Sequence, residues 1–136
     1  VLCGNVDNNL ALPASEFDMM SGVEVLTGAN DSELSALLTR ASHIVSASEY
    51  EGFGLPILEG LANGAKPILS DIPVYKELFS EVANFFSLDN YDGLTQIFST
   101  LETSEKTNDK EVVKDHLDRY SFARSAKTIN TLIQSL

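Results

Sequence analysis

Glu51 and Glu59 are the residues whose type and spacing most clearly indicate chemistry, and they enclose the segment EGFGLPILE. Gly52 and Gly54 carry no side chains, so the backbone amides there can approach a ligand closely. Pro56 is expected to begin a helix, and several backbone N–H groups at a helix start lack an internal partner. Such bare N–H groups bind phosphate and other anions. The segment therefore predicts an anion site.

The two glutamates are spaced to flank this anion site. Glu51 precedes the predicted helix, and at about 1.5 Å rise per residue Glu59 lies roughly 5 Å along the axis from Pro56. One carboxylate can accept hydrogen bonds from a sugar and the other from a ribose, whereas carboxylates placed closer would repel the phosphates. Hydrogen bonds to a charged group, at about 1.5–3 kcal/mol each, should outweigh a helix dipole contribution of about 0.3–1 kcal/mol.

The rest of the chain is expected to position this loop by alternating strands and helices. Short apolar runs predict strands at 1–4, 23–27, 43–47, 66–70 and 83–86. Amphipathic patterns predict helices at 13–20, from Asn30 or Asp31 to about 41, 56–64, 73–79, 90–101, 110–118 and 121–136. Alternation of this kind predicts an α/β fold, a Rossmann-like parallel sheet with helices on both faces. Ligands bind beyond the carboxyl ends of such strands, where the EGFG loop is expected.

The composition of the chain limits the classes of partner that it is expected to bind. The chain has 136 residues, 43% of them hydrophobic, and a formal net charge of −11 from nine basic and twenty acidic residues. This suits one domain with a real core and argues against nucleic acid or an anionic membrane as main partner. No apolar run approaches membrane-spanning length, so no transmembrane segment is expected. The single cysteine, Cys3, excludes an internal disulfide and favours a reducing, cytoplasmic location, with a buried and inert thiol.

The central motif resembles the E-x7-E motif of glycosyltransferase family 4, retaining enzymes of the glycosyltransferase-B fold. Residues 23–48 resemble the strand, loop, helix and strand that precede this motif in the family. Residues 66–78 are similar to the strand and short helix that follow it, and residues 120–133 to the closing helix. The resemblance thus covers roughly residues 20–136, and it adds a specific enzyme family to the anion site indicated by the residues themselves.

The resemblance implies a role for each residue of the motif. Glu51 would contact the donor sugar ring and orient its anomeric centre, as the catalytic residue. Glu59 would accept hydrogen bonds from the ribose hydroxyls, and Gly28-Ala29 would pass near the nucleobase. The substrate-binding residues implied in this way are Gly52, Phe53, Gly54, Leu55 and Glu59. No metal or other cofactor is implied, since amides and basic side chains meet the phosphate charge.

The resemblance also implies that residues 1–136 are a partial C-terminal nucleotide-sugar-binding domain. Its first strand and the N-terminal acceptor domain would lie upstream of Val1. The partners would be a nucleoside-diphosphate sugar and a glycan or lipid-linked acceptor, with peripheral membrane contact only through the absent parts. Family members bind the diphosphate with an Arg and a Lys, yet residues 1–39 contain neither residue type. Stabilisation of the leaving group is usually the largest catalytic effect, so the chain alone is expected to be inactive.

Two other functions fit the same architecture. A non-catalytic subunit could keep the fold and stabilise a partner transferase, although a scaffold has no need for both acids. An epimerase or phosphorylase would place other groups at the site, and none of the six lysines has the context of a cofactor-binding lysine.

Several residues outside the motif are expected to be structural. We expect His43 to be structural or exposed and His116 to be solvated, since His116 lies in a polar helix. Asp71 is expected to cap the helix that follows it. The apolar stripe of the last helix, formed by Phe122, Ala126, Ile129 and Ile133, is expected to pack in the core.

Overall fold

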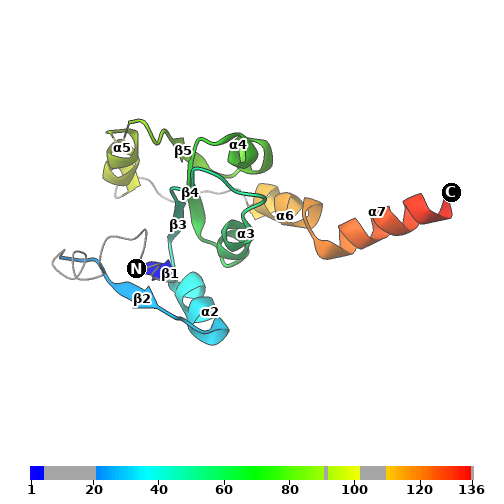
Figure 1. The fold of residues 1–136 in the computed structure, drawn as a ribbon, viewed down its shortest axis with the longest axis horizontal. Helices are drawn as coiled ribbons and strands as arrows, with labels where there is room; N and C mark the ends of the chain where they lie inside the picture. Colours follow the sequence, from blue (N-terminus) through cyan, green and yellow to red (C-terminus); the bar gives the residue numbers. More distant parts are fainter. Residues whose placement is uncertain (5–20, 91, 102–109, 136) are drawn as a thin grey trace. The chain divides into compact units, whose positions relative to one another are not determined.

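The computed structural model describes residues 1–4, 21–90, 92–101 and 110–135 (Figure 1). The helix predicted at 13–20 and the loop predicted at 102–109 lie outside these residues. The chain divides into two compact units, Val1–Leu37 and Leu38–Leu136, which are described one at a time.

The first unit contains a short parallel ladder. Strand β1 (Leu2–Gly4) pairs with β2 (Val25–Thr27), so that Leu2 lies opposite Val25. Both strands were predicted from the sequence. The predicted range of β2, 23–27, starts two residues earlier than the observed strand. Cys3 is exposed, so the expectation of a buried thiol is wrong.

Helix α2 (Asp31–Arg40) starts in the first unit and is capped reciprocally by two side chains. The Glu33 N–H donates to Asn30 Oδ1 at 3.0 Å, and the Asn30 N–H donates to Glu33 Oε2 at 2.9 Å. This pair satisfies two N–H groups at the helix start, which makes Asn30 rather than Asp31 the cap.

The second unit is built on three parallel strands in the order β3-β4-β5, namely β3 (His43–Ser46), β4 (Lys66–Ser70) and β5 (Asn84–Phe86). The central strand, β4, is buried from Pro67 to Ser70. A strand buried on both faces is typically a continuous apolar run, and Pro67-Ile68-Leu69 fits that rule before the strand ends at the buried polar Ser70.

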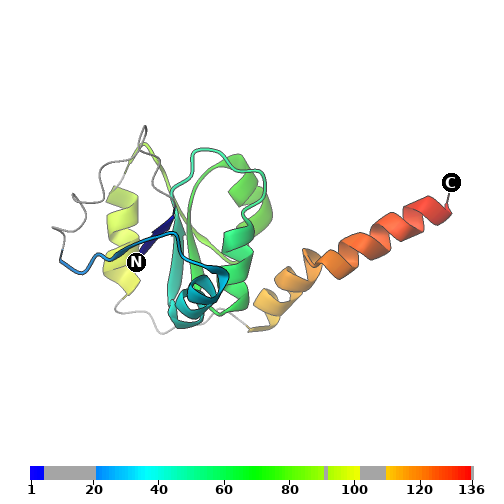
Figure 2. The ribbon, with the colours of Figure 1, turned by 60° about the horizontal axis from the view of Figure 1, so that its bottom comes forward.

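Helices cover both faces of this sheet. The helices packed on or beside the sheet are α3 (Leu55–Ala62), α4 (Pro73–Phe79), α5 (Asp92–Leu101) and α6 (Lys110–Arg119). The last helix, α7 (Phe122–Gln134), extends away from it (Figure 2). Figure 2 shows α5 on one side of the strands and α3 with α4 on the other. Helix α6 packs against α3. The predicted α/β, Rossmann-like fold with a parallel sheet is therefore confirmed.

The core of the second unit lies between this sheet and helices α3 and α4. Its buried members are Ile57, Leu61, Leu69, Ile72, Tyr75, Phe79 and Val82. Gly60 brings α3 close to the sheet, because a Cβ there would lie 3.0 Å from two side-chain carbons of Ile44. Strand β3 and helix α3, which the loop connects, are therefore tightly packed against each other.

Asp71 does not cap α4, contrary to expectation. The cap position is Ile72, and no side chain bonds the helix start. The Asp71 carboxylate instead accepts from Lys76 Nζ at 3.1 Å, on a half-exposed surface. Pro73, the first residue of the helix, has no N–H and so leaves one fewer unsatisfied donor at the helix start.

His116 is buried, so the expectation that it is solvated is wrong. Its ring lies between Phe79 and Tyr120, with centroid separations of 5.6 and 5.0 Å. Neither ring nitrogen has a hydrogen-bond partner among the described residues. Burial lowers the pKa of His116 below its ordinary value of 6.5, and the nearby Arg119 charge lowers it further, while Glu81 opposes them.

Helix α7 does not contribute to the core. None of its described residues is buried, and Phe122 is 84% exposed. Ile129 and Ile133 are exposed as well, so the predicted stripe exists on the helix but packs on no part of the second unit's core. Ser121 caps the helix by accepting from the Arg124 N–H at 3.3 Å.

Candidate functional site

The EGFG loop leaves the carboxyl end of β3 and enters α3, as the sequence predicted. Gly54 occupies the cap position of α3 with φ 93°, in the left-handed region. A Cβ on Gly54 would lie 3.0 Å from a ring carbon of Tyr75 and 3.4 Å from Phe79. Glycine is therefore required here for its backbone conformation and for the packing of buried aromatic rings, in addition to any approach by a ligand.

The start of α3 has unused hydrogen-bond donors. No side chain caps it, and Pro56 in the first turn has no N–H. The Ile57 N–H donates to the Gly54 carbonyl at 3.0 Å. In the part of the chain that the structure describes, the N–H groups of Phe53, Gly54 and Leu55 make no backbone hydrogen bond. These are open donors of the kind that bind anions at a helix start.

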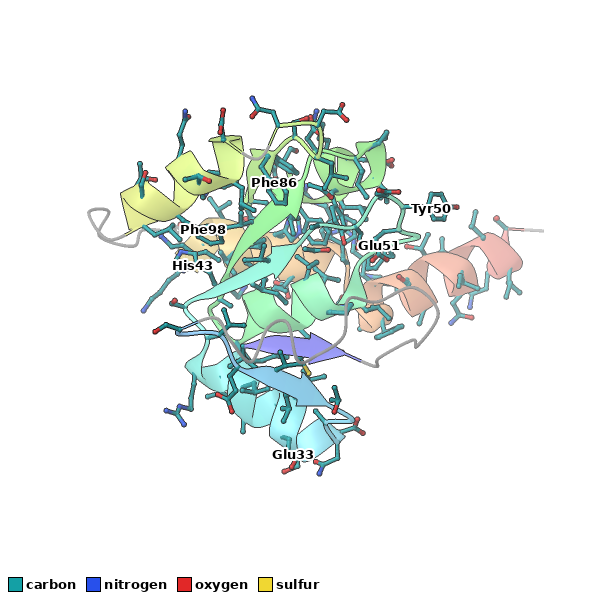
Figure 3. The ribbon with its side chains drawn as sticks, turned by 60° about the vertical axis from the view of Figure 1, so that its left-hand side comes forward. Glu33, His43, Tyr50, Glu51, Phe86 and Phe98 are labelled. Carbon is teal, nitrogen blue, oxygen red and sulfur yellow. The ribbon has the colours of Figure 1, made fainter. Side chains whose placement is uncertain are left out.

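The two glutamates differ in their surroundings. Glu51 is half-buried, and its Oε1 accepts a hydrogen bond from Ser48 Oγ at 2.9 Å. Figure 3 shows Glu51 and the neighbouring Tyr50 on the loop beyond the end of β3. Glu59 is exposed on α3, one turn after Leu55, and its carboxylate has no hydrogen bond or ion pair to any described residue. Both acids therefore have oxygen atoms free to accept hydrogen bonds.

The loop is braced by an aromatic contact. Phe53 is half-buried, and its ring meets Tyr120 edge-on, with centroids 5.8 Å apart. Tyr120 in turn contacts His116, which contacts Phe79 in the core. The side chain of Phe53 thus acts as an anchor while its N–H group stays open.

Sequence reasoning missed a row of hydroxyl groups beneath Glu51. Tyr75 Oη lies 2.9 Å from Ser46 Oγ, which lies 3.1 Å from Ser48 Oγ. Ser70 Oγ donates to the Ser48 carbonyl at 2.6 Å. The alternation of serines in SAS, just before the acid, was the available signal, but the role of Tyr75 on another helix leaves no trace in the local sequence.

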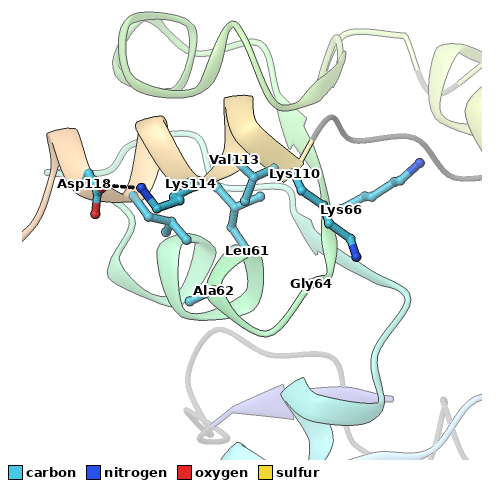
Figure 4. Close-up of a pocket in the computed structure, with 9 residues that line it drawn as sticks. Leu61, Ala62, Gly64, Lys66, Lys110, Val113, Lys114 and Asp118 are labelled. Atoms are coloured by element: carbon cyan, nitrogen blue, oxygen red, sulfur yellow. Dashed lines mark hydrogen bonds and ion pairs between the residues drawn. The ribbon is translucent and has the colours of Figure 1, made fainter.

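A hollow of about 410 Å³ lies elsewhere on the second unit, by the end of α3 and the start of β4 (Figure 4). It is lined by apolar residues of α3 and α6 and by Lys66, Lys110 and Lys114, the last paired with Asp118 at 3.3 Å. None of the predicted site residues lines it. Because β3 and β4 are parallel, this hollow and the EGFG loop lie at opposite ends of the sheet.

Comparison with known families agrees with the motif and the fold. The family model for glycosyl transferases group 1 matches residues 1–111, which is most of the chain. The chain therefore belongs to this glycosyltransferase family.

Similar proteins are bacterial mannosyltransferases. The chain is 30% identical over 92 residues to the O-antigen chain mannosyltransferase RfbU of Salmonella typhimurium, covering 66% of this chain and 26% of that protein. It is 33% identical over 75 residues to the GDP-mannose:cellobiosyl-diphosphopolyprenol alpha-mannosyltransferase of Xanthomonas oryzae pv. oryzae, covering 55% and 20%. It is 40% identical over 62 residues to the serotype-specific mannosyltransferase WbdA of Escherichia coli, covering 46% and 8%.

The chain thus spans about a quarter or less of the length of these relatives. No solved structure matches it significantly. Among the described residues, no helix has the length and apolar character needed to cross a lipid bilayer.

Proposed function

We propose that this chain binds the nucleotide-sugar donor of a retaining glycosyltransferase. The observation that carries the proposal is the uncapped start of α3, with open N–H groups at Phe53, Gly54 and Leu55, between two acids with free oxygen atoms. The N–H groups of the loop, Gly52 included, bind the distal phosphate or the sugar. Glu51 is the catalytic residue that orients the sugar, and Glu59 binds the ribose hydroxyls.

The donor proposed is a nucleoside-diphosphate hexose, with GDP-mannose as the first ligand to test. The names of the relatives support this choice, since each is a mannosyltransferase and one is named for GDP-mannose. The acceptor proposed is a glycan or a lipid-linked glycan, in the synthesis of a polysaccharide.

We propose that acceptor binding and the cations for the leaving diphosphate come from protein outside residues 1–136. The much greater length of the relatives supports this, as does the absence of Lys and Arg from residues 1–39. Without those groups the chain binds a donor weakly and transfers no sugar.

Calorimetric titration of the complete protein with GDP-mannose, UDP-glucose and the free nucleoside diphosphates tests donor binding. Glu59→Ala should weaken binding of both the nucleoside diphosphate and its sugar by about tenfold, since it removes hydrogen bonds between a charged group and the ribose. Glu51→Gln should weaken the nucleotide sugar and leave the nucleoside diphosphate unchanged.

Glu49→Ala is the matched control, because Glu49 is an exposed acid of the same loop with no hydrogen bond to a described residue. Unchanged affinity in Glu59→Ala would reject its proposed role. The anomeric configuration of the product, read by NMR, tests retention.

A further inference from the structure

A row of hydroxyl groups connects the buried core to the carboxylate of Glu51. It begins at Tyr75 Oη on α4, which is 1% exposed, and passes through Ser46 at the end of β3. It continues through Ser48 Oγ, 3.1 Å away, to Glu51 Oε1 at 2.9 Å. The row therefore joins a helix, a strand and a loop that are distant in the sequence.

The number of protons fixes the direction of every hydrogen bond in the row. An ionised carboxylate can only accept hydrogen bonds, so the single hydroxyl proton of Ser48 is donated to Glu51. Ser48 must then accept from Ser46, and Ser46 must accept from Tyr75. All three hydroxyl protons point toward Glu51 Oε1. Hydrogen bonds aligned in one direction polarise and strengthen one another.

The middle of the row is also held by the backbone. Ser70, fully buried on β4, donates its hydroxyl to the Ser48 carbonyl at 2.6 Å. Ser48 is therefore fixed at its side chain by Ser46 and at its main chain by Ser70. Both supports originate from neighbouring parallel strands, so the loop cannot shift at Ser48 without disturbing the sheet edge.

Only one oxygen of Glu51 is used by this arrangement. Oε1 accepts from Ser48, and Oε2 accepts no hydrogen bond from any residue that the structure describes. A carboxylate with one oxygen held by a hydrogen bond has less rotational freedom before a ligand arrives. Preorganisation of this kind favours binding, because the ordering cost is met during folding.

We propose that Ser48, with Ser46 and Tyr75 behind it, is a positioning residue that fixes Glu51 Oε1 and leaves Oε2 for a hydroxyl of the donor sugar. This inference rests on the function proposed above for Glu51. It assigns to the serines and the tyrosine an effect on the sugar half of the donor alone. The nucleoside-diphosphate half depends on Glu59 at the ribose and on the loop N–H groups at the distal phosphate, and the row does not touch either.

The test compares GDP-mannose with GDP in calorimetric titrations of the complete protein. If the protein binds UDP-glucose instead, the comparison is between UDP-glucose and UDP. Ser48→Ala should weaken GDP-mannose about tenfold and leave GDP unchanged, since a hydrogen bond to a charged group is lost. Tyr75→Phe, which keeps the buried ring, should weaken GDP-mannose about two- to fourfold. Ser99→Ala, an exposed serine on α5, is the control and should change neither.

A double-mutant cycle separates positioning from general support of the loop. With Glu51→Ala already present, Ser48→Ala should have no further effect on GDP-mannose, because no carboxylate remains to be positioned. Equal weakening of GDP and GDP-mannose in Ser48→Ala would overturn the proposal, as would a full additional loss in the double variant. A wild-type protein that binds no nucleotide sugar refutes the donor-binding function itself. Wild-type binding with unchanged Ser48→Ala refutes the positioning role alone.

Discussion

Phe53, between the two glycines of the loop, packs edge-on against Tyr120, which follows the end of α6. Their ring centroids are 5.8 Å apart, and Tyr120 continues the contact to the buried His116. The loop proposed to bind the donor is thus supported by a residue more than sixty positions later in the chain. Support of this kind gives the loop one conformation without using its N–H groups.

Tyr120→Ala should destabilise the second unit and weaken donor binding. Truncation removes an edge-on aromatic pair and uncovers the rings of Phe53 and His116, for an expected loss of about 2 kcal/mol. Chemical denaturation measures the loss. Tyr50→Ala is the control in the same loop, since Tyr50 is 89% exposed and its loss should change stability by less than about 0.5 kcal/mol. Equal effects of the two substitutions would contradict the anchoring role of Tyr120.

Alanine substitutions at Gly52, Gly54 and Gly64, which lie before and after α3, should separate the cost of backbone strain from the cost of steric crowding. Gly64 has φ 87° with open space around it, so Gly64→Ala should cost about 1 kcal/mol. Gly54 combines φ 93° with the 3.0 Å approach to Tyr75, so Gly54→Ala should cost about 2–4 kcal/mol. Gly52 has neither feature, and Gly52→Ala should be close to neutral. Thermal or urea unfolding measures the stability of the three variants. A Gly52→Ala variant as unstable as Gly54→Ala would refute the explanation by backbone strain and steric crowding.

Stability should fall as the pH is lowered below about 6.5 because of His116. Burial and Arg119 lower its pKa in the folded state. Between the folded and unfolded pKa values, His116 is therefore protonated in the unfolded chain and neutral in the folded chain. The contribution of neutral His116 is therefore complete above the unfolded value of about 6.5 and is lost between that pH and the folded pKa. The slope is at most about 1.4 kcal/mol per pH unit.

His116→Leu, of similar size, is the control for this pH effect. It removes two unpaired ring nitrogens, so it should be neutral or stabilising at pH 8 and should lose less stability than wild type between pH 7 and pH 5. Urea unfolding at each pH measures both. Parallel pH profiles of the two proteins would exclude His116 as the titrating group.

Arg119→Gln should raise the pKa of His116 while changing stability little. Burial is the larger cause that lowers this pKa and the Arg119 charge is the second, so without Arg119 only burial opposes the raising effect of Glu81. The ion pair of Arg119 with Glu81, at 3.2 Å, is about half exposed, so its loss should cost less than about 1 kcal/mol. NMR titration of the His116 ring protons follows the shift. An unchanged midpoint would show that the Arg119 charge does not contribute to this pKa shift.

The sequence predicted the parallel strands, the order of helices and the loop between β3 and α3. These follow from local rules, namely apolar runs ended by glycine and a proline near the start of a helix. The boundaries shifted by one or two residues, as with α3, which begins at Leu55 rather than Pro56. The roles assigned to Glu51 and Glu59 stay predictions.

Burial could be predicted less well, because it depends on which elements meet. His116 lies in a segment with many charges, yet Val113, His116, Leu117 and Tyr120 recur at helical spacing and all face inward. That stripe was the signal for a buried histidine. The stripe of α7 is equally regular and is exposed, since periodicity identifies an apolar face without saying what covers it.

The family model ends at residue 111, one residue beyond the start of α6. An expression boundary chosen at that point would delete both Tyr120 and His116. The shortened protein would keep the whole E-x7-E motif but lose the aromatic brace behind Phe53, together with the ion pair at Glu81. Domain dissection should therefore cut no earlier than Ser121, after the residue that packs against Phe53.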